Sequence, residues 1–374
     1  MQNNINKFDF AIVGGGLAGL CLAIQMAQFN KSVVLFEKNE YPFHKVCGEY
    51  ISNESWSFLE SLGLRLSQMN LPIINKLGVS STKGFMLEAP LKMGGFGISR
   101  FTLDYELSLL AKKYGVTVLE NCKVNNVDKS DNDYLIETAI GKFKSKVVCG
   151  SYGKLNPIFM DKKLKPNTPN YIGVKYHIKT HFDSNKIELH NFKDGYCGIS
   201  KVDGEKYCLC YLTTAKNLNN HNNDIKQLEE NILYENPFLK SVFLNSEFLY
   251  DKALTISQVT FEKKLAFSNN MFLLGDAAGA IAPLCGNGMS MGMRASKLLA
   301  TLLNSYFNGE ISYKEIVNLY TLQWNQNFSN RINAGYYLQQ LLGKNNVTHL
   351  SLKFLHSTPK LLQKLISLTH GQSF

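Results

Sequence analysis

The stretch that decides the fold is FDFAIVGGGLAGLCLAIQMAQFNKSVVLFE, residues 8–37. Its apolar start, residues 8–13, has the pattern of a buried strand, and the Ala- and Leu-rich stretch that runs to Gln28 has helical character. A second apolar run, residues 32–36, ends at Glu37. A strand, a helix and a strand within this length predict a βαβ unit with two parallel strands.

Three glycines follow the first predicted strand in the order G-x-G-x-x-G. Gly14 permits a tight turn, Gly16 lets the backbone approach a pyrophosphate, and Gly19 allows close packing of the helix on the strand. The start of the helix offers free N–H groups and a positive dipole end, and Glu37 is placed to hydrogen-bond an adenosine ribose. An ordinary structural turn is the alternative. The predicted contacts of this dinucleotide site are Gly14, Gly16, Leu17, Ala18, Gly19, Glu37 and Lys38.

A second glycine-rich segment, residues 271–289, distinguishes between the dinucleotides that share this pattern. An apolar strand delivers Asp276 into a turn, and residues 286–289 then open another helix. This segment resembles the Gly-Asp motif of FAD enzymes in the p-hydroxybenzoate hydroxylase superfamily, which includes a geranylgeranyl-reductase-like branch. The resemblance implies FAD as the cofactor, with Asp276 on a ribityl hydroxyl and the start of the helix near the flavin. The contacts that it implies are Gly275, Asp276, Gly286, Asn287, Gly288 and Met289.

Two further segments carry the same resemblance. Ser99-Arg100, followed by Leu103-Asp104, is similar to a family segment whose Arg lies along the phosphate–ribityl chain of FAD, and a surface Arg is the alternative. Residues 44–49 (HKVCGE) resemble the Cys-Gly loop that approaches the flavin ring in the reductase-like branch, although Cys47 also fits a small buried position. The flavin itself carries the chemistry, and the implied ring-lining residues are Cys47, Gly48, Pro283, Cys285 and Gly286.

Several departures limit what the resemblance implies about the reaction. The strand that ends at residues 147–153 lacks the Asp-Gly pair that hydroxylases of the superfamily usually carry. Residues 195–200 keep the Tyr of the reductases' Y-x-W-x-F-P signature but none of its other side chains. Trp occurs only at 56 and 324, so the W-x-W-x-I-P segment of flavin halogenases is absent. No second dinucleotide pattern is present, which argues against a two-Rossmann disulfide reductase.

Composition bounds the remaining possibilities. Hydrophobic residues make up 45% of the 374 and charged residues 19%, which excludes a disordered chain and suggests two domains. The net charge of +10 comes almost entirely from Lys, so it favours a compositional bias over nucleic-acid binding, which we do not expect. The eight cysteines lack C-x-x-C spacing and the eight histidines lack ligand spacing, so we expect reduced thiols, a cytoplasmic protein and no metal.

The C-terminal stretch 350–368 mixes leucines with Lys353, Lys360 and Lys364. One interpretation is a pair of helices that covers the FAD domain or a substrate tunnel. The alternative is a basic amphipathic surface that rests on an anionic membrane. No apolar run approaches the ~20 residues that span a bilayer. The N-terminus also lacks the apolar core of a signal peptide.

The sequence therefore predicts an α/β (α+β) fold, in which a Rossmann-like FAD-binding domain carries an inserted antiparallel-sheet substrate domain and C-terminal helices. The predicted function is a single-component, NAD(P)H-dependent FAD monooxygenase that acts on a small apolar substrate, aromatic or lipidic. A geranylgeranyl-reductase-like C=C reductase and a non-catalytic flavin-binding protein are the alternatives. The predicted ranges are 1–75, 95–155 and 255–310 for the FAD domain, 76–94 and 156–254 for the substrate domain, and 311–374 for the C-terminal helices.

Overall fold

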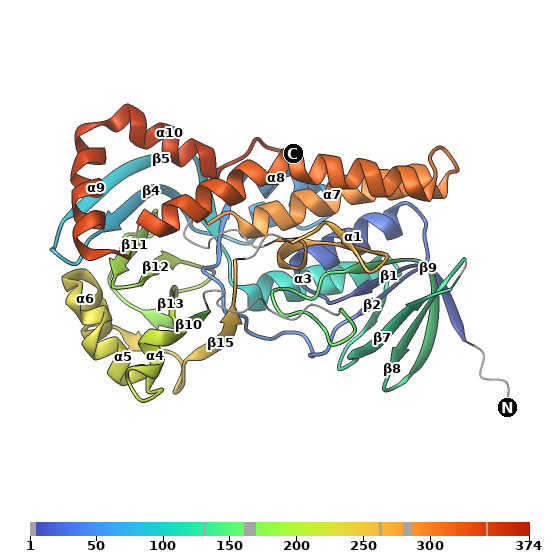
Figure 1. The fold of residues 1–374 in the computed structure, drawn as a ribbon, viewed down its shortest axis with the longest axis horizontal. Helices are drawn as coiled ribbons and strands as arrows, with labels where there is room; N and C mark the ends of the chain where they lie inside the picture. Colours follow the sequence, from blue (N-terminus) through green and yellow to red (C-terminus); the bar gives the residue numbers. More distant parts are fainter. Residues whose placement is uncertain (1–4, 131, 161–169, 262–263, 280–285, 342) are drawn as a thin grey trace.

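Two β-sheets stand side by side, and a layer of helices runs along both of them (Figure 1). The computed structural model describes residues 5–130, 132–160, 170–261, 264–279, 286–341 and 343–374. Within these ranges the N-terminal sheet lies at one end of the long axis and the second sheet lies at the other. The mixture of parallel and antiparallel strands with C-terminal helices is the predicted fold class.

The first sheet is built around the N-terminal strand, in the order β16-β17-β9-β1-β2-β6. β1 lies between two parallel neighbours, with Val13 opposite both Phe36 and Gly150. The helix α1 connects β1 to β2, so the predicted βαβ unit is confirmed. The elements are β1 (Asn6–Val13), α1 (Leu17–Gln28), β2 (Val33–Phe36), β6 (Thr117–Leu119), β9 (Gly141–Gly150), β16 (Phe267–Ser268) and β17 (Met271–Leu273), with β7 (Val124–Lys129) and β8 (Tyr134–Thr138) as a hairpin beside β9.

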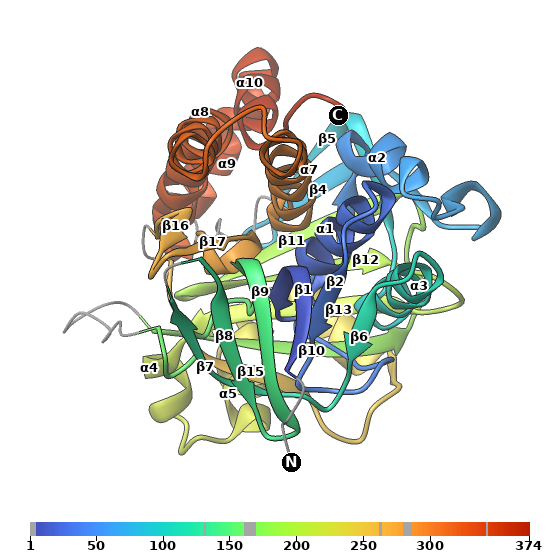
Figure 2. The same cartoon turned by 90° about the vertical axis from the view of Figure 1, so that its right-hand side faces the viewer.

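A long-range strand pairing brings the two glycine-rich segments together. β17 pairs in parallel with β9, which itself pairs with β1, so the turn after β17 lies on the same sheet edge as the turn after β1 (Figure 2). The helix α7 (Gly288–Phe307) follows and packs against α1. A Cβ on Gly292 would lie 3.3 Å from the Ala18 Cβ, so the two helices approach closely there.

The second sheet has the order β14-β10-β13-β12-β11-β4-β5-β3, with β15 beside β10. The ends of the β4–β5 hairpin and the strand β15 belong to this sheet, although they lie outside the ranges 76–94 and 156–254 that were predicted for the substrate domain. β4 pairs in parallel with β11, with Leu77 opposite Ile187, a contact that local patterning does not signal. Its strands are β3 (Tyr50–Ser52), β4 (Ile73–Ser80), β5 (Met86–Gly97), β10 (Tyr171–Lys179), β11 (Lys186–Phe192), β12 (Gly195–Lys201), β13 (Tyr207–Thr214), β14 (Glu247–Phe248) and β15 (Leu254–Val259).

Helices cover the outer faces of both sheets. The helix α3, which starts at Arg100, packs against α1 and β6. The short helices between residues 225 and 244 close the far side of the second sheet, over a core that includes Val174, Leu209 and Leu239. The remaining helices are α2 (Trp56–Ser61), α3 (Arg100–Lys113), α4 (Ala215–Asn219), α5 (Ile225–Asn231), α6 (Pro237–Leu244), α8 (Tyr313–Leu341), α9 (Asn345–Ser357) and α10 (Pro359–Thr369), with 3-10 turns at Asn53–Ser55, Leu66–Gln68, Leu233–Glu235 and Gly275–Ala277. Among the described residues, no helix combines the length and the apolar character that crossing a membrane requires.

A buried carboxyl lies under the second sheet, where α5 packs on β10 and β13. Glu229 Oε1 accepts hydrogen bonds of 2.9 Å from the hydroxyls of Tyr176 and Tyr211. Burial raises the pKa of Glu229 to about 7, and the two hydroxyls reduce that effect only in part. This group therefore folds in its protonated form at mildly acid pH.

Replacing Glu229 with Gln is expected to flatten one part of the pH dependence of stability. The pKa of Glu229 is about 7 in the folded protein and 4.5 in the unfolded chain. The protonated carboxyl therefore contributes its full stabilisation of the fold below pH 4.5, and this contribution is lost as the pH rises to about 7. We expect the wild type to lose about 3 kcal/mol relative to Glu229→Gln over this window. Urea unfolding of both proteins across the window measures the difference, and parallel pH profiles would contradict it.

Candidate functional site

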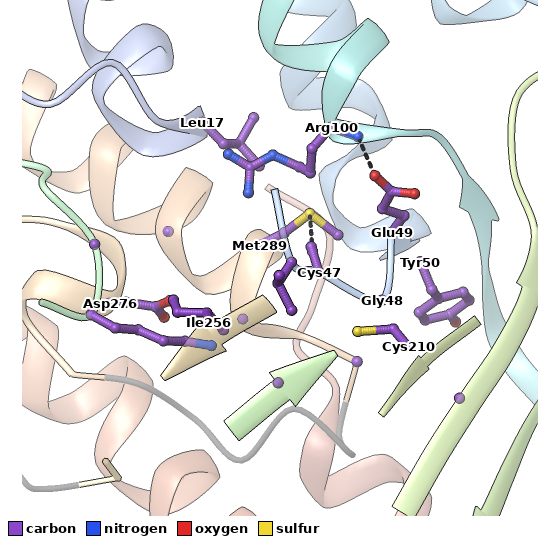
Figure 3. Close-up of a pocket in the computed structure, with 18 of the residues that line it drawn as sticks. Leu17, Cys47, Gly48, Glu49, Tyr50, Arg100, Cys210, Ile256, Asp276 and Met289 are labelled. Atoms are coloured by element: carbon purple, nitrogen blue, oxygen red, sulfur yellow. Dashed lines mark hydrogen bonds between the residues drawn. The ribbon is translucent and has the colours of Figure 1, made fainter. Parts of the chain in front are cut away.

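A cavity of about 240 Å³ lies between the two sheets, at the edge where the two glycine-rich turns meet (Figure 3). One wall comes from the start of α1 and from the β17–α7 region, including Leu17, Asp276 and Met289. The opposite wall comes from the face of the second sheet, and the loop before β3 passes between the two. The cavity therefore brings together segments from both ends of the chain.

The first glycine turn is held against the strand end of β9. Gly14 has a φ of +105°, and a Cβ there would lie 2.5 Å from the Ser151 carbonyl oxygen. A Cβ on Gly19 would lie 2.5 Å from the Gly14 carbonyl oxygen, so the turn and the helix are in direct contact. Gly16 differs, because the nearest atoms to its Cβ position are 3.7 and 3.9 Å away. Its backbone faces the cavity, which leaves space for a ligand beside it.

The predicted ribose contact, Glu37, is engaged with its own neighbourhood. Its carboxylate accepts hydrogen bonds from the backbone N–H of Gly15 at 3.0 Å and from the N–H and side-chain amide of Asn39. The Tyr41 hydroxyl donates to the Gly15 carbonyl and covers the same turn. Glu37 is buried, whereas the adjacent Lys38 is exposed. The acid at this position thus orients the glycine turn from the end of β2.

Asp276 is half-buried and lines the cavity. Within the described ranges its carboxylate has no hydrogen-bond partner, although its backbone carbonyl accepts one from Lys264 at 3.2 Å. Gly286, Gly288 and Met289 line the cavity beside it, at the start of α7. An acceptor without a partner next to a helix N-terminus suits a ligand that carries hydroxyl groups and negative charge.

One predicted residue of this segment, Asn287, does not line the cavity, and two others lie outside the described residues. Asn287 is fully buried, and its side-chain amide donates to the Thr369 carbonyl at 2.5 Å, so it anchors the end of α10 rather than lining the cavity. The reason is that position 287 precedes the first turn of α7, on the side that faces the C-terminal helix. Pro283 and Cys285 lie outside the described residues.

Arg100 begins α3 and lines the cavity (Figure 3). Its guanidinium makes two hydrogen bonds to Asp104, of 2.8 and 2.6 Å, and Lys45 Nζ lies 2.9 Å from the same carboxylate. Burial on its own raises the pKa of Asp104, but the two cations outweigh it and hold that pKa below its usual range. Two cations share one carboxylate, so this corner of the cavity has a net positive charge and suits an anionic group.

The loop of residues 44–49 presents Cys47 and Gly48 to the cavity (Figure 3). The Cys47 Sγ lies 3.7 Å from the Met289 Sδ, and its carbonyl accepts a hydrogen bond of 3.2 Å from the Cys208 thiol on β13. The predicted Cys-Gly loop is therefore placed beside the start of α7.

Glu49 ends this loop in a conformation that is uncommon for a residue with a side chain, with a φ of +57° and no exposed surface. Its carboxylate accepts hydrogen bonds from the Arg100 N–H at 2.7 Å and from Lys175 Nζ at 2.5 Å, and it is 2.6 Å from His177 Nε2. Lys175 also donates to the Lys45 carbonyl at 3.1 Å. The buried carboxylate thus fastens the loop to α3 and to β10 at once.

The same cluster continues toward the surface of the protein. His177 Nδ1 lies 2.5 Å from the Tyr250 hydroxyl, which is also 3.1 Å from a ring nitrogen of His44. Burial and the nearby Lys175 lower the pKa of His44 to about 4. For Glu49, burial alone raises the pKa, but the contacts with His177 and Lys175 outweigh it, so the pKa lies below its usual range. The carboxylate is therefore ionised and paired.

Glu49, His177 and Cys208 also form a group whose candidate metal-ligating atoms lie within 4.8 Å of one another. The Lys175 ammonium contacts the Glu49 carboxylate directly, at 2.5 Å. This ammonium places a positive charge beside the position that a metal ion would take. The local chemistry is that of a buried ion pair.

The face of the second sheet forms the apolar wall of the cavity. Gly173 on β10, Gly198 on β12 and Cys210 on β13 leave this face shallow, while Ile256 and Val259 of β15 close one end. At the other end Tyr50 and Ile187 line the cavity, and the Tyr50 hydroxyl is buried without a hydrogen-bond partner among the described residues. An apolar molecule fits this wall better than a charged one.

Sequence reasoning missed the buried cluster of Glu49, Lys175 and His177. One signal was available, since Lys175 and His177 interrupt the otherwise apolar run 172–178 at alternate positions. Alternate residues share one face of a strand. A Lys that is fully buried on such a face needs an ionised partner.

Comparison with known proteins agrees with this geometry. Residues 12–47 match the family model of the NAD(P)-binding Rossmann-like domain. The chain is 23% identical over 330 residues to conditioned medium factor receptor 1 of Dictyostelium discoideum, which covers 80% of this chain but only 64% of that receptor. It is 22% identical over 353 residues to a digeranylgeranylglycerophospholipid reductase of Methanococcus vannielii, which covers 86% of this chain and 83% of the reductase.

Solved structures resemble almost the whole chain. A flavin-dependent brominase matches with a TM-score of 0.79 at 16% identity, over 97% of this chain and 93% of its own. A geranylgeranyl bacteriochlorophyll reductase-like protein of Thermoplasma acidophilum matches with a TM-score of 0.76 at 15% identity, over 99% and 93%. The chain has the fold of FAD-dependent oxidoreductases. These neighbours are flavin-dependent or reductase-like proteins, and at such identities the likeness defines the fold and not the reaction.

Proposed function

We propose that this protein is an FAD-dependent oxidoreductase that acts on a small apolar substrate, aromatic or lipidic. One observation carries the proposal: the turn at Gly14–Gly19, the Asp276 carboxylate and the start of α7 border one cavity with an apolar far wall, and that carboxylate has no partner among the described residues. These are a phosphate-binding turn, a hydroxyl acceptor and an anion-stabilising helix end. They match the parts of FAD in the order in which its diphosphate, ribityl chain and flavin follow one another.

The residues present fit such a cofactor. The open backbone at Gly16 would bind the diphosphate, Asp276 would accept from a ribityl hydroxyl, and the start of α7 at Gly288 and Met289 would face the flavin. Arg100 would approach the phosphate–ribityl chain from the positively charged corner of the cavity. The flavin supplies the redox chemistry when bound. The chain's own residues bind and orient the cofactor and keep water out along the apolar wall.

We propose a monooxygenase as the reaction type, with NAD(P)H as the electron donor. The match to an NAD(P)-binding Rossmann-like domain is compatible with such a donor, although its residues 12–47 contain the glycine turn that we assign to FAD. The alternative is a C=C reductase, which the position of the Cys47-Gly48 loop at the cavity and the likeness to a digeranylgeranylglycerophospholipid reductase favour. A flavin-binding protein without catalysis is the third possibility.

An anaerobic assay separates these possibilities. With NAD(P)H and an apolar substrate, a monooxygenase is expected to stop after flavin reduction and to form product only when oxygen is admitted. Product formed without oxygen would instead establish the reductase. Purified protein that stays colourless and gains no flavin spectrum after addition of FAD would overturn the whole proposal.

Replacing Asp276 with Ala is expected to weaken FAD binding about 10- to 100-fold, because a charge-assisted hydrogen bond to the ribityl chain is lost. Arg100→Ala is expected to have a smaller effect, since Lys45 remains beside Asp104 in that corner. Fluorescence titration of the apoprotein with FAD measures both. Unchanged affinity in Asp276→Ala would show that this acid does not hold the cofactor.

A further inference from the structure

The last part of the chain has an unusual charge distribution. No Asp or Glu occurs between Ile316 and Phe374, whereas Arg331, Lys344 and three further lysines do. This segment forms most of α8, which runs along the length of the molecule, and all of α9 and α10, which lie at one end of it (Figure 1). Because the rest of the chain contains many carboxylates, this segment of the chain is selectively basic.

The outer face of α9 is apolar as well as basic. Val347, Leu350 and Phe354 are spaced by three and four residues, so they share one face of the helix, and they are 43%, 66% and 59% exposed. The opposite face holds Leu352, which is 2% exposed and packs against the β4–β5 hairpin. Lys353 is exposed beside Phe354. The helix therefore has two apolar faces. Among the described residues, only the inner face packs against other side chains.

α10 repeats this arrangement. Leu361 and Leu368 are 39% and 50% exposed, and Lys364 lies between them on the same face. Leu362 is buried on the inner face, and Lys360 is exposed at the start of the helix. Both helices thus expose leucines next to lysines, and α9 exposes a phenylalanine as well.

The neighbouring hairpin adds positive charge rather than negative charge. Burial, Lys353 and Lys83 together lower the pKa of His349 on α9, and Ser81, two residues before Lys83, has its hydroxyl oxygen 3.0 Å from His349 Nδ1. The nearby acid Glu88 is paired with Lys186 at 2.5 Å. Lys186 also contacts Glu188 on β11, at 2.5 Å, and Glu235 accepts a long hydrogen bond of 3.5 Å from Asn345 at the start of α9.

A groove of about 430 Å³ lies between α10 and β5, next to this face. Leu91, Met93 and Ile366 give it an apolar lining, and Lys92 and Lys364 flank it. Leu91 and Ile366 pack in one apolar cluster with Tyr50 and Ile187, which line the main cavity. The groove and the proposed active site are therefore bordered by the same apolar cluster.

We propose that the outer face of α9 and α10 is a docking surface for an anionic lipid bilayer. The exposed leucines and Phe354 would enter the boundary between headgroups and acyl chains, and Lys353, Lys360 and Lys364 would contact the anionic headgroups. A second copy of this chain is a poorer occupant, because two such faces would bring like charges together. Docking does not depend on the proposed function. The idea that the bilayer supplies an apolar substrate through the groove beside Tyr50 does rest on the proposed function.

Co-sedimentation with vesicles tests the proposal. The protein is expected to bind vesicles of phosphatidylcholine that contain phosphatidylserine, to bind pure phosphatidylcholine much less, and to dissociate as the salt concentration rises. Lys353→Glu, Lys360→Glu and Lys364→Glu combined are expected to weaken partitioning by at least fivefold per lysine. The double variant Leu350→Ser with Phe354→Ser is expected to weaken vesicle binding even when the three lysines are kept.

Matched controls keep the test specific. Ile140, which is 63% exposed at the turn between β8 and β9, lies at the far end of the molecule, so Ile140→Ser should leave binding unchanged. Lys113→Glu with Lys240→Glu and Lys297→Glu makes the same change in net charge at exposed sites on other helices. If these controls lost binding as fully as the α9–α10 variants, the effect would come from net charge alone and the docking surface would be wrong.

Two other outcomes would overturn the proposal. The first is equal binding, or none, to both kinds of vesicle. The second is a shift in oligomeric state in Leu350→Ser with Phe354→Ser, measured by sedimentation velocity, which would assign the face to a second copy. The assay needs neither substrate nor NAD(P)H. Protein that binds vesicles but no flavin would therefore refute the proposed function alone, and protein that binds flavin but no vesicles would refute docking alone.

Discussion

Replacing Lys175 with Met is expected to lower the free energy of unfolding by about 3–5 kcal/mol, because it leaves the Glu49 carboxylate buried without its main counter-charge. Both side chains have no exposed surface, and they are 2.5 Å apart. Urea unfolding at neutral pH measures the change. Lys179→Met on the same strand is the matched control, since Lys179 is 55% exposed and pairs with Glu247 at 3.5 Å. That change is expected to cost less than about 1 kcal/mol.

The double variant Lys175→Met with Glu49→Gln tests the cause. A neutral amide at position 49 still accepts the hydrogen bond from the Arg100 N–H, and no unpaired charge is buried. Part of the lost stability should therefore return, and the two substitutions should be strongly non-additive. Additive losses, or a Lys175→Met effect no larger than that of Lys179→Met, would mean that the ion pair is not what fastens the loop.

Replacing Gly14 with Ala is the second change with a large expected effect. A Cβ at this position meets the Ser151 carbonyl oxygen at 2.5 Å and the Tyr152 Cα at 2.8 Å, in a residue with a φ of +105°. Both partners are backbone atoms of the neighbouring strand end, so they cannot rotate away. We expect a loss of more than about 2 kcal/mol of stability and loss of FAD retention during purification. Thermal unfolding and flavin absorbance of the purified protein measure these two effects.

Gly115→Ala isolates backbone strain from the steric clash. Gly115 has a φ of +88° with no atom within 4 Å of its Cβ position, and it lies in the turn after α3, away from the cavity. This control should lose about 1 kcal/mol of stability and keep its flavin. If Gly14→Ala behaved like Gly115→Ala in both measurements, then close packing of the turn on the β9 strand end would not be needed for the cofactor site.

The glycine turn and the Gly-Asp segment were predictable because their signals are local. Each combines a strand, a turn and a helix within about 30 residues, and the positive φ of Gly14 belongs to the turn itself. Their meeting on one sheet edge was predictable only through the family resemblance. Nothing local in residues 271–273 indicates that they pair with β9.

The second sheet was harder to predict because its strands come from distant parts of the chain. β4 pairs with β11 across more than a hundred residues, and β15 joins the same sheet although it directly precedes the Gly-Asp segment. The ends of such strands depend on partners that patterning does not reveal. The Glu49 cluster was missed for the same reason, since Glu49 and Lys175 are far apart in sequence and neither residue alone indicates a pair.

The loop of residues 44–49 has a consequence for motion. It is tied to the first half of the molecule through Lys45 and Asp104, and to the second half through Cys208 and Lys175. A hinge movement that opened the cavity between the sheets would have to break a buried ion pair. Separation of the two halves is therefore costly, which favours entry of substrates along the edge of the cavity over opening of the domains.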